Sequence, residues 1–121
     1  KSLSKKYRLT KNGSFSYLYA HGSRAAEKPV RLNFVKSKSG VKIGFSVSNK
    51  IGHAVVRNKV KRRMRAIAAE YIKRLAPCQA VFIVSAGVDK LSFNQLKSRM
   101  DMCFVRSGLL KKSDDEKEKK D

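Results

Sequence analysis

The segment from Lys50 to Arg65, KIGHAVVRNKVKRRMR, concentrates the residues of this chain that could do chemistry. It holds seven lysines and arginines and no acidic residue. In a helix, these cations would fall in the first turns, where the positive end of the helix dipole disfavours each positive charge by ~0.3–1 kcal/mol. An external polyanion would remove that penalty. The chemistry that the segment predicts is therefore the binding of phosphate groups.

The net charge of the chain supports the same interpretation. It is +20, and the last eleven residues, KKSDDEKEKKD, add nothing because they hold five lysines and five acids. Residues 1–110 carry the whole excess with four acids, Glu27, Glu70, Asp89 and Asp101. A nucleic acid would relieve the resulting repulsion and release counterions from its own backbone. A solvated charge run is the alternative, but no acids alternate with the cations of the basic segment.

Other chemistries find little support in the residues. The four acids are scattered, and no Ser–His–Asp or Cys–His set has a supporting context, which argues against a protein-only nuclease. His21, His53, Cys78 and Cys103 lack metal-ligand spacing, so no metal is expected on the protein. No stretch approaches the ~18–20 apolar residues of a membrane span. The two cysteines are expected to be reduced thiols in a cytoplasmic protein, with a disulfide between them as the alternative.

Hydrophobic periodicity predicts the elements that must position the basic segment. Alternation predicts strands over 30–35 and 41–48, with residues 37–40 as a hairpin turn between them. A continuous apolar run predicts a buried strand over 80–84. Between the second and third strands, apolar residues at spacings of three and four predict a helix from about 54 to 75. Its apolar stripe consists of Val56, Val60, Met64, Ile67, Tyr71 and Leu75.

Two further helices are predicted at the ends of the domain. Apolar residues at spacings of three and four predict a first helix near 11–20. Ser92 and Gln95 form a capping-box pattern at the start of a last helix, which Gly108 ends.

The order of these elements predicts a single α+β domain over residues 1–110. We expect a two-layer sandwich of a small, about four-stranded sheet with three helices, containing a β-α-β crossover. Residues 1–9 are expected to form an arm, and residues 23–28 a polar loop. The charged tail, 111–121, is expected to be disordered.

The junction between the second strand and the long helix resembles a known family. Residues 44–50 read GFSVSNK and residues 51–65 read IGHAVVRNKVKRRMR. They are similar to the GxSVSKK strand and the IGxAVxRNRxKRxxR helix of the protein subunit of bacterial ribonuclease P. Upstream, YRL at 7–9 and FSYLYAHG at 15–22 look more weakly like the family's opening, RLxxxxDF…VFxxG. The resemblance covers about residues 5–110.

The resemblance implies a fold, a function and partners. The family folds as an α+β sandwich with a left-handed crossover, whereas general rules alone would favour a right-handed one. The protein would belong to a ribonucleoprotein endonuclease that removes the 5′ leader from precursor tRNA. Hydrolysis would be done by Mg²⁺ held by the RNA subunit, with no cofactor on the protein alone. The implied partners are the catalytic RNA and precursor tRNA, and neither a membrane nor a protein partner is predicted.

The resemblance also assigns site residues. The family's basic helix motif binds the catalytic RNA, and the matching positions are Lys50, Arg57, Asn58, Lys59, Lys61, Arg62 and Arg65. The family holds the single-stranded 5′ leader in a cleft between the first helix and the sheet. The matching positions are Phe15, Tyr19 and Ser46, with Arg57 and Asn58 at the rim. Aromatic rings suit a leader cleft because any base can stack on them, at ~1–3 kcal/mol per base.

Four positions depart from the family pattern. Lys59 keeps the charge of the usual arginine but lacks its planar fork. Asn49 replaces a lysine of the turn, and Gly87 stands near a common arginine. Asn33 stands where the first strand often has a tyrosine, which would leave the cleft with one stacking ring fewer. None of these changes breaks the basic helix, but they bear on how the leader is recognised.

Two alternatives stay open at this point. Phe15 and Tyr19, four residues apart on a short helix, could equally be core residues, although Tyr19 tolerates water better. Ser46 faces either solvent or the cleft. For the function, a ribosomal or rRNA-binding protein would share the charge, size and fold class, but would lack the SVSNKIGHAVVRN run.

Overall fold

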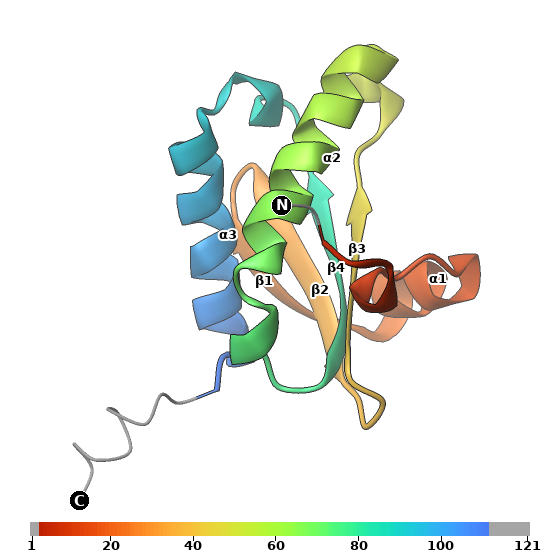
Figure 1. The fold of residues 1–121 in the computed structure, drawn as a ribbon. Coiled ribbons are helices and arrows are strands. Elements are labelled where there is room, and N and C mark those ends of the chain that lie inside the picture. The colour runs from red at the N-terminus through yellow and green to blue at the C-terminus, as the bar shows by residue number, and fades with distance from the viewer. Residues whose placement is uncertain (1–2, 112–121) are drawn as a thin grey trace, which may run out of the picture.

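The computed structural model describes residues 3–111, which form three α-helices and one four-stranded sheet (Figure 1). The helices are α1 (Asn12–His21), α2 (Ala54–Ala69) and α3 (Phe93–Ser107), and the strands are β1 (Ser23–Glu27), β2 (Val30–Lys36), β3 (Val41–Ser46) and β4 (Cys78–Val84). Four 3₁₀ turns lie at Lys5–Tyr7, Asn49–Ile51, Ile72–Arg74 and Val88–Lys90. The predicted α+β architecture is confirmed.

The sheet has the strand order β1-β2-β4-β3, with β2 and β4 antiparallel and β3 and β4 parallel. The predicted hairpin at residues 37–40 is therefore wrong, because β4 lies between the two strands that this turn connects. The reason is hydrophobic: β4 is the most apolar strand and takes an interior position, where both faces are covered. The parallel β3–β4 pair, joined through α2, is the predicted β-α-β unit, and the hand of its crossover stays a prediction.

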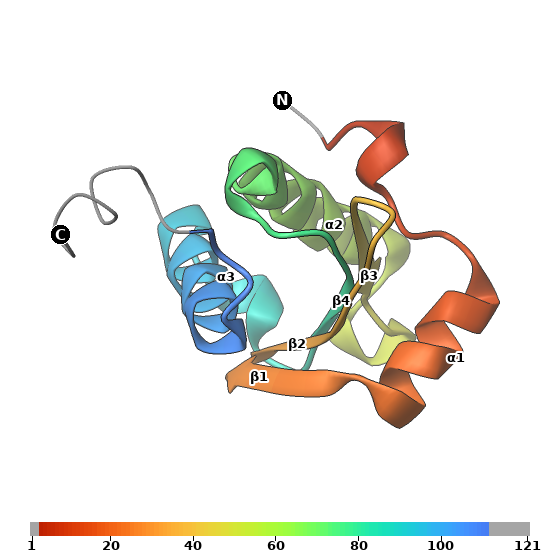
Figure 2. The ribbon, with the colours of Figure 1, turned by 90° about the horizontal axis from the view of Figure 1, so that it is seen from below.

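The helices cover both faces of the sheet (Figure 2). α2 and α3 pack on one face over the main core, to which α2 contributes its predicted stripe, with Val60, Met64 and Ile67 buried. α1 packs on the other face over a second, smaller core that contains Leu18 and Val81. The structure thus adds to the prediction that α1 is separated from the other two helices by the sheet.

The last helix forms as its sequence predicts. The Ser92 hydroxyl accepts a hydrogen bond from the Gln95 backbone N–H at 3.1 Å, and the Gln95 side chain accepts one from the Ser92 N–H at 2.9 Å. This confirms the capping box, a feature worth about 1 kcal/mol. The helix ends at Gly108, whose φ of 74° lies in the left-handed region that favours glycine.

Two predicted boundaries are wrong. Residues 23–27, predicted as part of a loop, form β1, because pairing with β2 and packing of α3 bury Ala25 against the sheet. α2 ends at Ala69 instead of about 75, and a 3₁₀ turn at Ile72–Arg74 follows. Burial of the apolar stripe nevertheless continues through Tyr71 and Leu75.

The N-terminal segment is attached to the domain. Leu3 is buried in the main core, and the Leu9 N–H donates to the Ile43 carbonyl at 3.0 Å along the outer edge of β3. Of the predicted tail, Lys111 is described and donates its backbone N–H to the Arg74 carbonyl. Residues 112–121 lie outside the described part of the chain.

Candidate nucleic-acid interface

α2 and the 3₁₀ turn before it present the predicted RNA-binding residues. Lys50, Asn58, Lys59 and Arg62 are exposed, and Arg57, Lys61 and Arg65 are half-buried. Arg57 donates from Nε to the Gly52 carbonyl at 3.2 Å, which holds its guanidinium against the turn before the helix. None of the other six side chains forms a hydrogen bond or ion pair with any residue of the described range 3–111. Their charge and polar groups are therefore available to a partner.

Three of the four acidic residues of the domain interact with residues outside the predicted RNA-binding set. Glu27 pairs with Arg106 at 2.7 Å and Glu70 with Lys97 at 2.8 Å, so two of the four acids neutralise cations of α3. Asp101 accepts a hydrogen bond from the Tyr71 hydroxyl at 2.6 Å between α2 and α3. Burial, together with Asp101, raises the pKa of Tyr71 far above its usual range, so the hydroxyl remains a donor. Within residues 3–111, neither ion pair involves a cation of α2, so the positive charge of this helix is not neutralised by an ion pair.

Phe15 and β3 meet on the α1 face of the sheet. A Cβ atom at Gly44 would lie 2.5 Å from Cζ of the Phe15 ring, so the ring rests where β3 has no side chain. Phe15 is half-buried by this contact, whereas Tyr19 is 39% exposed. Ser46 is half-buried and follows Gly44 on the same face of the strand. Phe15 is thus partly a core residue, whereas the Tyr19 side chain is exposed to solvent.

A small hollow joins α1, β3 and α2. Its volume is about 90 Å³, and its lining includes Arg8, Phe15, Gly44 and Arg65. Because β3 is an edge strand, Arg65 of α2 reaches the same hollow as Phe15 of α1. The structure therefore brings one member of the predicted RNA-binding set next to one member of the predicted leader cleft. No side-chain hydrogen bond within residues 3–111 joins Tyr19 or Ser46 to Arg57 or Asn58.

Asn33 differs from its sequence-based interpretation. Its side chain is fully buried beneath α1 and donates from Nδ2 to the Leu18 carbonyl at 3.2 Å. Its Oδ1 atom has no hydrogen-bond partner among residues 3–111. Asn33 therefore fixes the C-terminal part of α1 to β2. The alternation of polar and apolar residues in β2 did not predict the burial of Asn33. The second core, which contains Leu18 and Val81, lies on the same face of the sheet.

The cysteines and histidines form no reactive or metal-binding site within residues 3–111. Cys78 and Cys103 are buried free thiols, as expected for reduced cysteines, and burial raises the pKa of each to about 11. Residues 3–111 contain no cluster of three or more His, Cys, Asp or Glu that could hold a metal ion. His53 is exposed just before α2. Within that same range, no helix combines the length and apolar character needed to cross a membrane.

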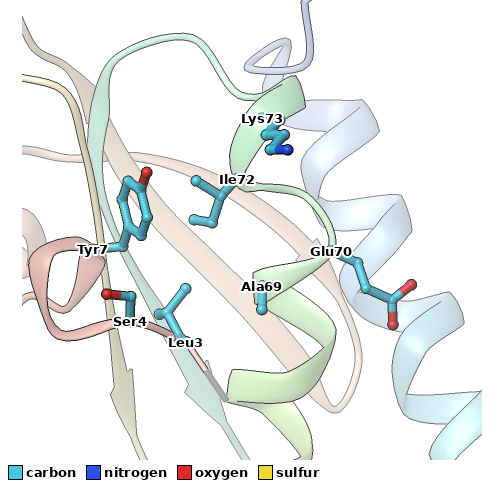
Figure 3. Close-up of a pocket in the computed structure, with 7 residues that line it drawn as sticks. All are labelled: Leu3, Ser4, Tyr7, Ala69, Glu70, Ile72 and Lys73. Atoms are coloured by element: carbon cyan, nitrogen blue, oxygen red, sulfur yellow. The ribbon is translucent and has the colours of Figure 1, made fainter. Parts of the chain in front are cut away.

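Another hollow is lined by none of the predicted RNA-binding residues (Figure 3). It measures about 430 Å³ and lies between the N-terminal segment and the C-terminal end of α2. Its lining consists of Leu3, Ser4, Tyr7, Ala69, Glu70, Ile72 and Lys73. Glu70 points away from Leu3 and Tyr7 in Figure 3 and pairs with Lys97. With one lysine and a largely apolar wall, this hollow does not suit a polyanion.

A small α+β fold whose long basic helix has no ion-pair partner within residues 3–111 defines a nucleic-acid-binding protein. Comparison with known proteins then gives the family. The sequence model described as Ribonuclease P matches residues 3–108. The chain is 34% identical over 113 residues to the ribonuclease P protein component of Bacillus velezensis, which covers 92% of this chain and 97% of that protein. It is also 34% identical over 100 residues to the component of Lactococcus lactis, covering 82% and 86%.

Solved structures agree with this result. The RNase P protein of Staphylococcus aureus superposes with a TM-score of 0.78 at 25% identity, covering 93% of this chain and 99% of that one. The RNase P protein of Thermotoga maritima shares the fold, with a TM-score of 0.70 at 21% identity, covering 77% and 90%. The chain belongs to the family of bacterial ribonuclease P protein components. It is thus the protein subunit of the ribonucleoprotein endonuclease that matures the 5′ ends of tRNA, and the ribosomal alternative is set aside.

Proposed function

We propose that the start of α2 binds the RNase P RNA and that the groove between α1 and β3 holds the 5′ leader of precursor tRNA. The observation that carries this proposal is the charge distribution. Lys59, Lys61 and Arg62 have no counter-charge within the described part of the chain, whereas Glu27 and Glu70 neutralise cations of α3. Phosphates of the RNA would supply the missing negative charge and release their own counterions.

The leader side of the proposal rests on α1. Tyr19 offers an exposed ring on which a base can stack, and Phe15 offers a half-buried ring edge above Gly44. Stacking tolerates any base, which suits a leader whose sequence differs from one precursor tRNA to another. Arg57 and Asn58, at the first turns of α2, would contact the leader's phosphates from the rim of the groove.

The chemistry is proposed to belong to the RNA subunit. Glu27, Glu70 and Asp101 each form an ion pair or hydrogen bond within the protein. Asp89 lies in a 3₁₀ turn and belongs to no acidic cluster that could hold a metal ion within residues 3–111. Mg²⁺ bound by the RNA would activate water and stabilise the leaving oxygen. The protein would act by neutralising phosphates and orienting the leader. Its partners would be the two RNAs, in a cytoplasm that keeps both buried thiols reduced.

The test is cleavage of precursor tRNA by a bacterial RNase P RNA at low Mg²⁺, with and without the protein. The expected result is that the protein restores cleavage, and that alanine at Lys59, Lys61 and Arg62 raises the protein concentration required. Alanine at Lys97 of α3, which pairs with Glu70, serves as the control and should leave that concentration unchanged. Cleavage that does not respond to the protein, or equal effects of the two sets of variants, would contradict the proposal.

A further inference from the structure

A second polar hollow lies at the N-terminal foot of α1, at the other end of β3 from Ser46. Its volume is about 160 Å³. The polar residues that line it are Arg8, Thr10, Lys11, Ser14, Lys42 and Gln79. They comprise three cations, two hydroxyls and one amide, and no acid contributes to the lining. No residue of this hollow belongs to the basic motif of α2.

The fold brings these residues together from three segments. Lys42 and Gln79 are directly opposite each other in the parallel β3–β4 pair, and they form the floor. The segment from Arg8 to Lys11 crosses from the edge of β3, where Leu9 bonds to Ile43, to the start of α1. Ser14 closes the hollow from the first turn of α1.

The lining is polar, and two of its residues have side chains without a partner in the described part of the chain. Lys42 and Gln79 are half-buried, yet neither side chain forms a hydrogen bond or ion pair with any residue between 3 and 111. Arg8 is held beside the hollow by a hydrogen bond from its Nε to the Leu3 carbonyl at 2.9 Å. Lys11 and Lys42 line one small space and repel each other, and this repulsion is stronger where water is partly excluded. A bound anion would offset it.

We propose that this hollow binds a backbone phosphate of single-stranded RNA, namely a leader nucleotide lying beyond Phe15. The inference rests on the proposed leader groove. Lys42, Gly44 and Ser46 share one face of β3, so the hollow lies about 13 Å along the strand from Ser46. Arg8 lines both this hollow and the neighbouring one that contains Phe15, which makes the path continuous. The lining has hydroxyls and cations but no ring, which favours a phosphate over a base.

The experiment measures the affinity of the reconstituted holoenzyme for precursor tRNAs whose leaders increase one nucleotide at a time. The test variant is Lys42→Gln, and the matched control is Lys38→Gln, which removes the same charge from an exposed turn residue outside the hollow. The expected result is an affinity loss of several-fold for Lys42→Gln with long leaders only. Precursor tRNAs with short leaders, which end before the hollow, should bind with equal affinity to the holoenzymes that carry Lys42→Gln and Lys38→Gln.

A second pair of variants removes ambiguity about folding. Gln79→Glu keeps the side-chain size but places a negative charge in the hollow, and Asn94→Asp adds the same charge at the exposed start of α3. Gln79→Glu should lose more affinity than Asn94→Asp, again for long leaders only. Losses equal to those of the controls at every length, or losses independent of length, would overturn the inference. If Tyr19→Ala also left leader binding unchanged, the proposed groove itself would fail instead.

Discussion

The ring of Phe15 occupies the space that a side chain at position 44 would need. A Cβ at Gly44 would lie 2.5 Å from Cζ and 2.8 Å from Cε1 of that ring. Through this contact α1 packs directly on β3. The Phe15 ring lies against the backbone of the strand because Gly44 has no side chain. The geometry of the proposed leader groove therefore depends on a glycine on one element and an aromatic residue on another.

Replacing Gly44 with alanine should move Phe15 and shift α1. We expect a loss of about 1–3 kcal/mol in the free energy of unfolding, measured by urea denaturation, because the added methyl group overpacks the contact. Preference for precursor over mature tRNA should fall, while affinity for the RNA subunit stays unchanged. Gly13→Ala is the control, since a Cβ there meets nothing within 4 Å. It should be neutral or stabilising, and equal effects of the two variants would contradict this view.

Asn33 should be sensitive to charge. In Asn33→Asp the carboxyl group would be buried beneath α1, which raises its pKa above the unfolded value of about 3.9. The folded state then binds more protons than the unfolded state, so stability relative to the parent falls as pH rises through the unfolded pKa and up to the folded one. Urea denaturation between pH 4 and 8 should show this growing deficit. A deficit that does not change with pH would show that position 33 becomes solvated.

The cations of α2 should set the salt dependence of RNA binding. Alanine at Lys61, Arg62 and Arg65 should weaken binding to the RNA subunit and lower the slope of log affinity against log salt by about one for each lost phosphate contact. Lys97→Ala should leave the slope unchanged, because Lys97 of α3 already pairs with Glu70 at the end of α2. The measurement is a binding isotherm at several salt concentrations. Identical slopes for all variants would place the RNA elsewhere.

The two thiols should be unreactive in the folded protein. Their pKa values of about 11 leave almost no thiolate at pH 7.5, and both side chains are buried. Alkylation by iodoacetamide, followed by mass spectrometry, should therefore be slow in buffer and fast in urea. Rapid modification of Cys78 or Cys103 without denaturant would contradict the packing of the main core.

Local signals account for what could be predicted from the sequence. The capping box at Ser92 and the apolar stripe of α2 act within a few residues, so each was visible as a pattern. β1 was missed because nothing in Ser23–Glu27 itself favours a strand, and pairing with β2 creates it. The strand order was missed for a related reason, since a short turn between β2 and β3 normally joins neighbours.

The candidate site divides in the same way. The basic part of α2 could be recognised because its cations lie close together in the chain, within residues 57–65. The burial of Asn33 and the hollow around Lys42 could not, since each depends on α1 crossing the second face of the sheet. Which residues meet there is decided by segments far apart in the chain.

The central claim is that the protein holds the leader while the RNA performs the cleavage. Its most direct test compares dissociation constants for precursor and mature tRNA under single-turnover conditions, with the RNA alone, the holoenzyme, and the holoenzyme carrying Tyr19→Ala. We predict that the holoenzyme prefers the precursor by roughly 5- to 150-fold, the equivalent of one stacked base, and that Tyr19→Ala removes much of this preference. Equal binding of precursor and mature tRNA by the wild-type holoenzyme would contradict the claim.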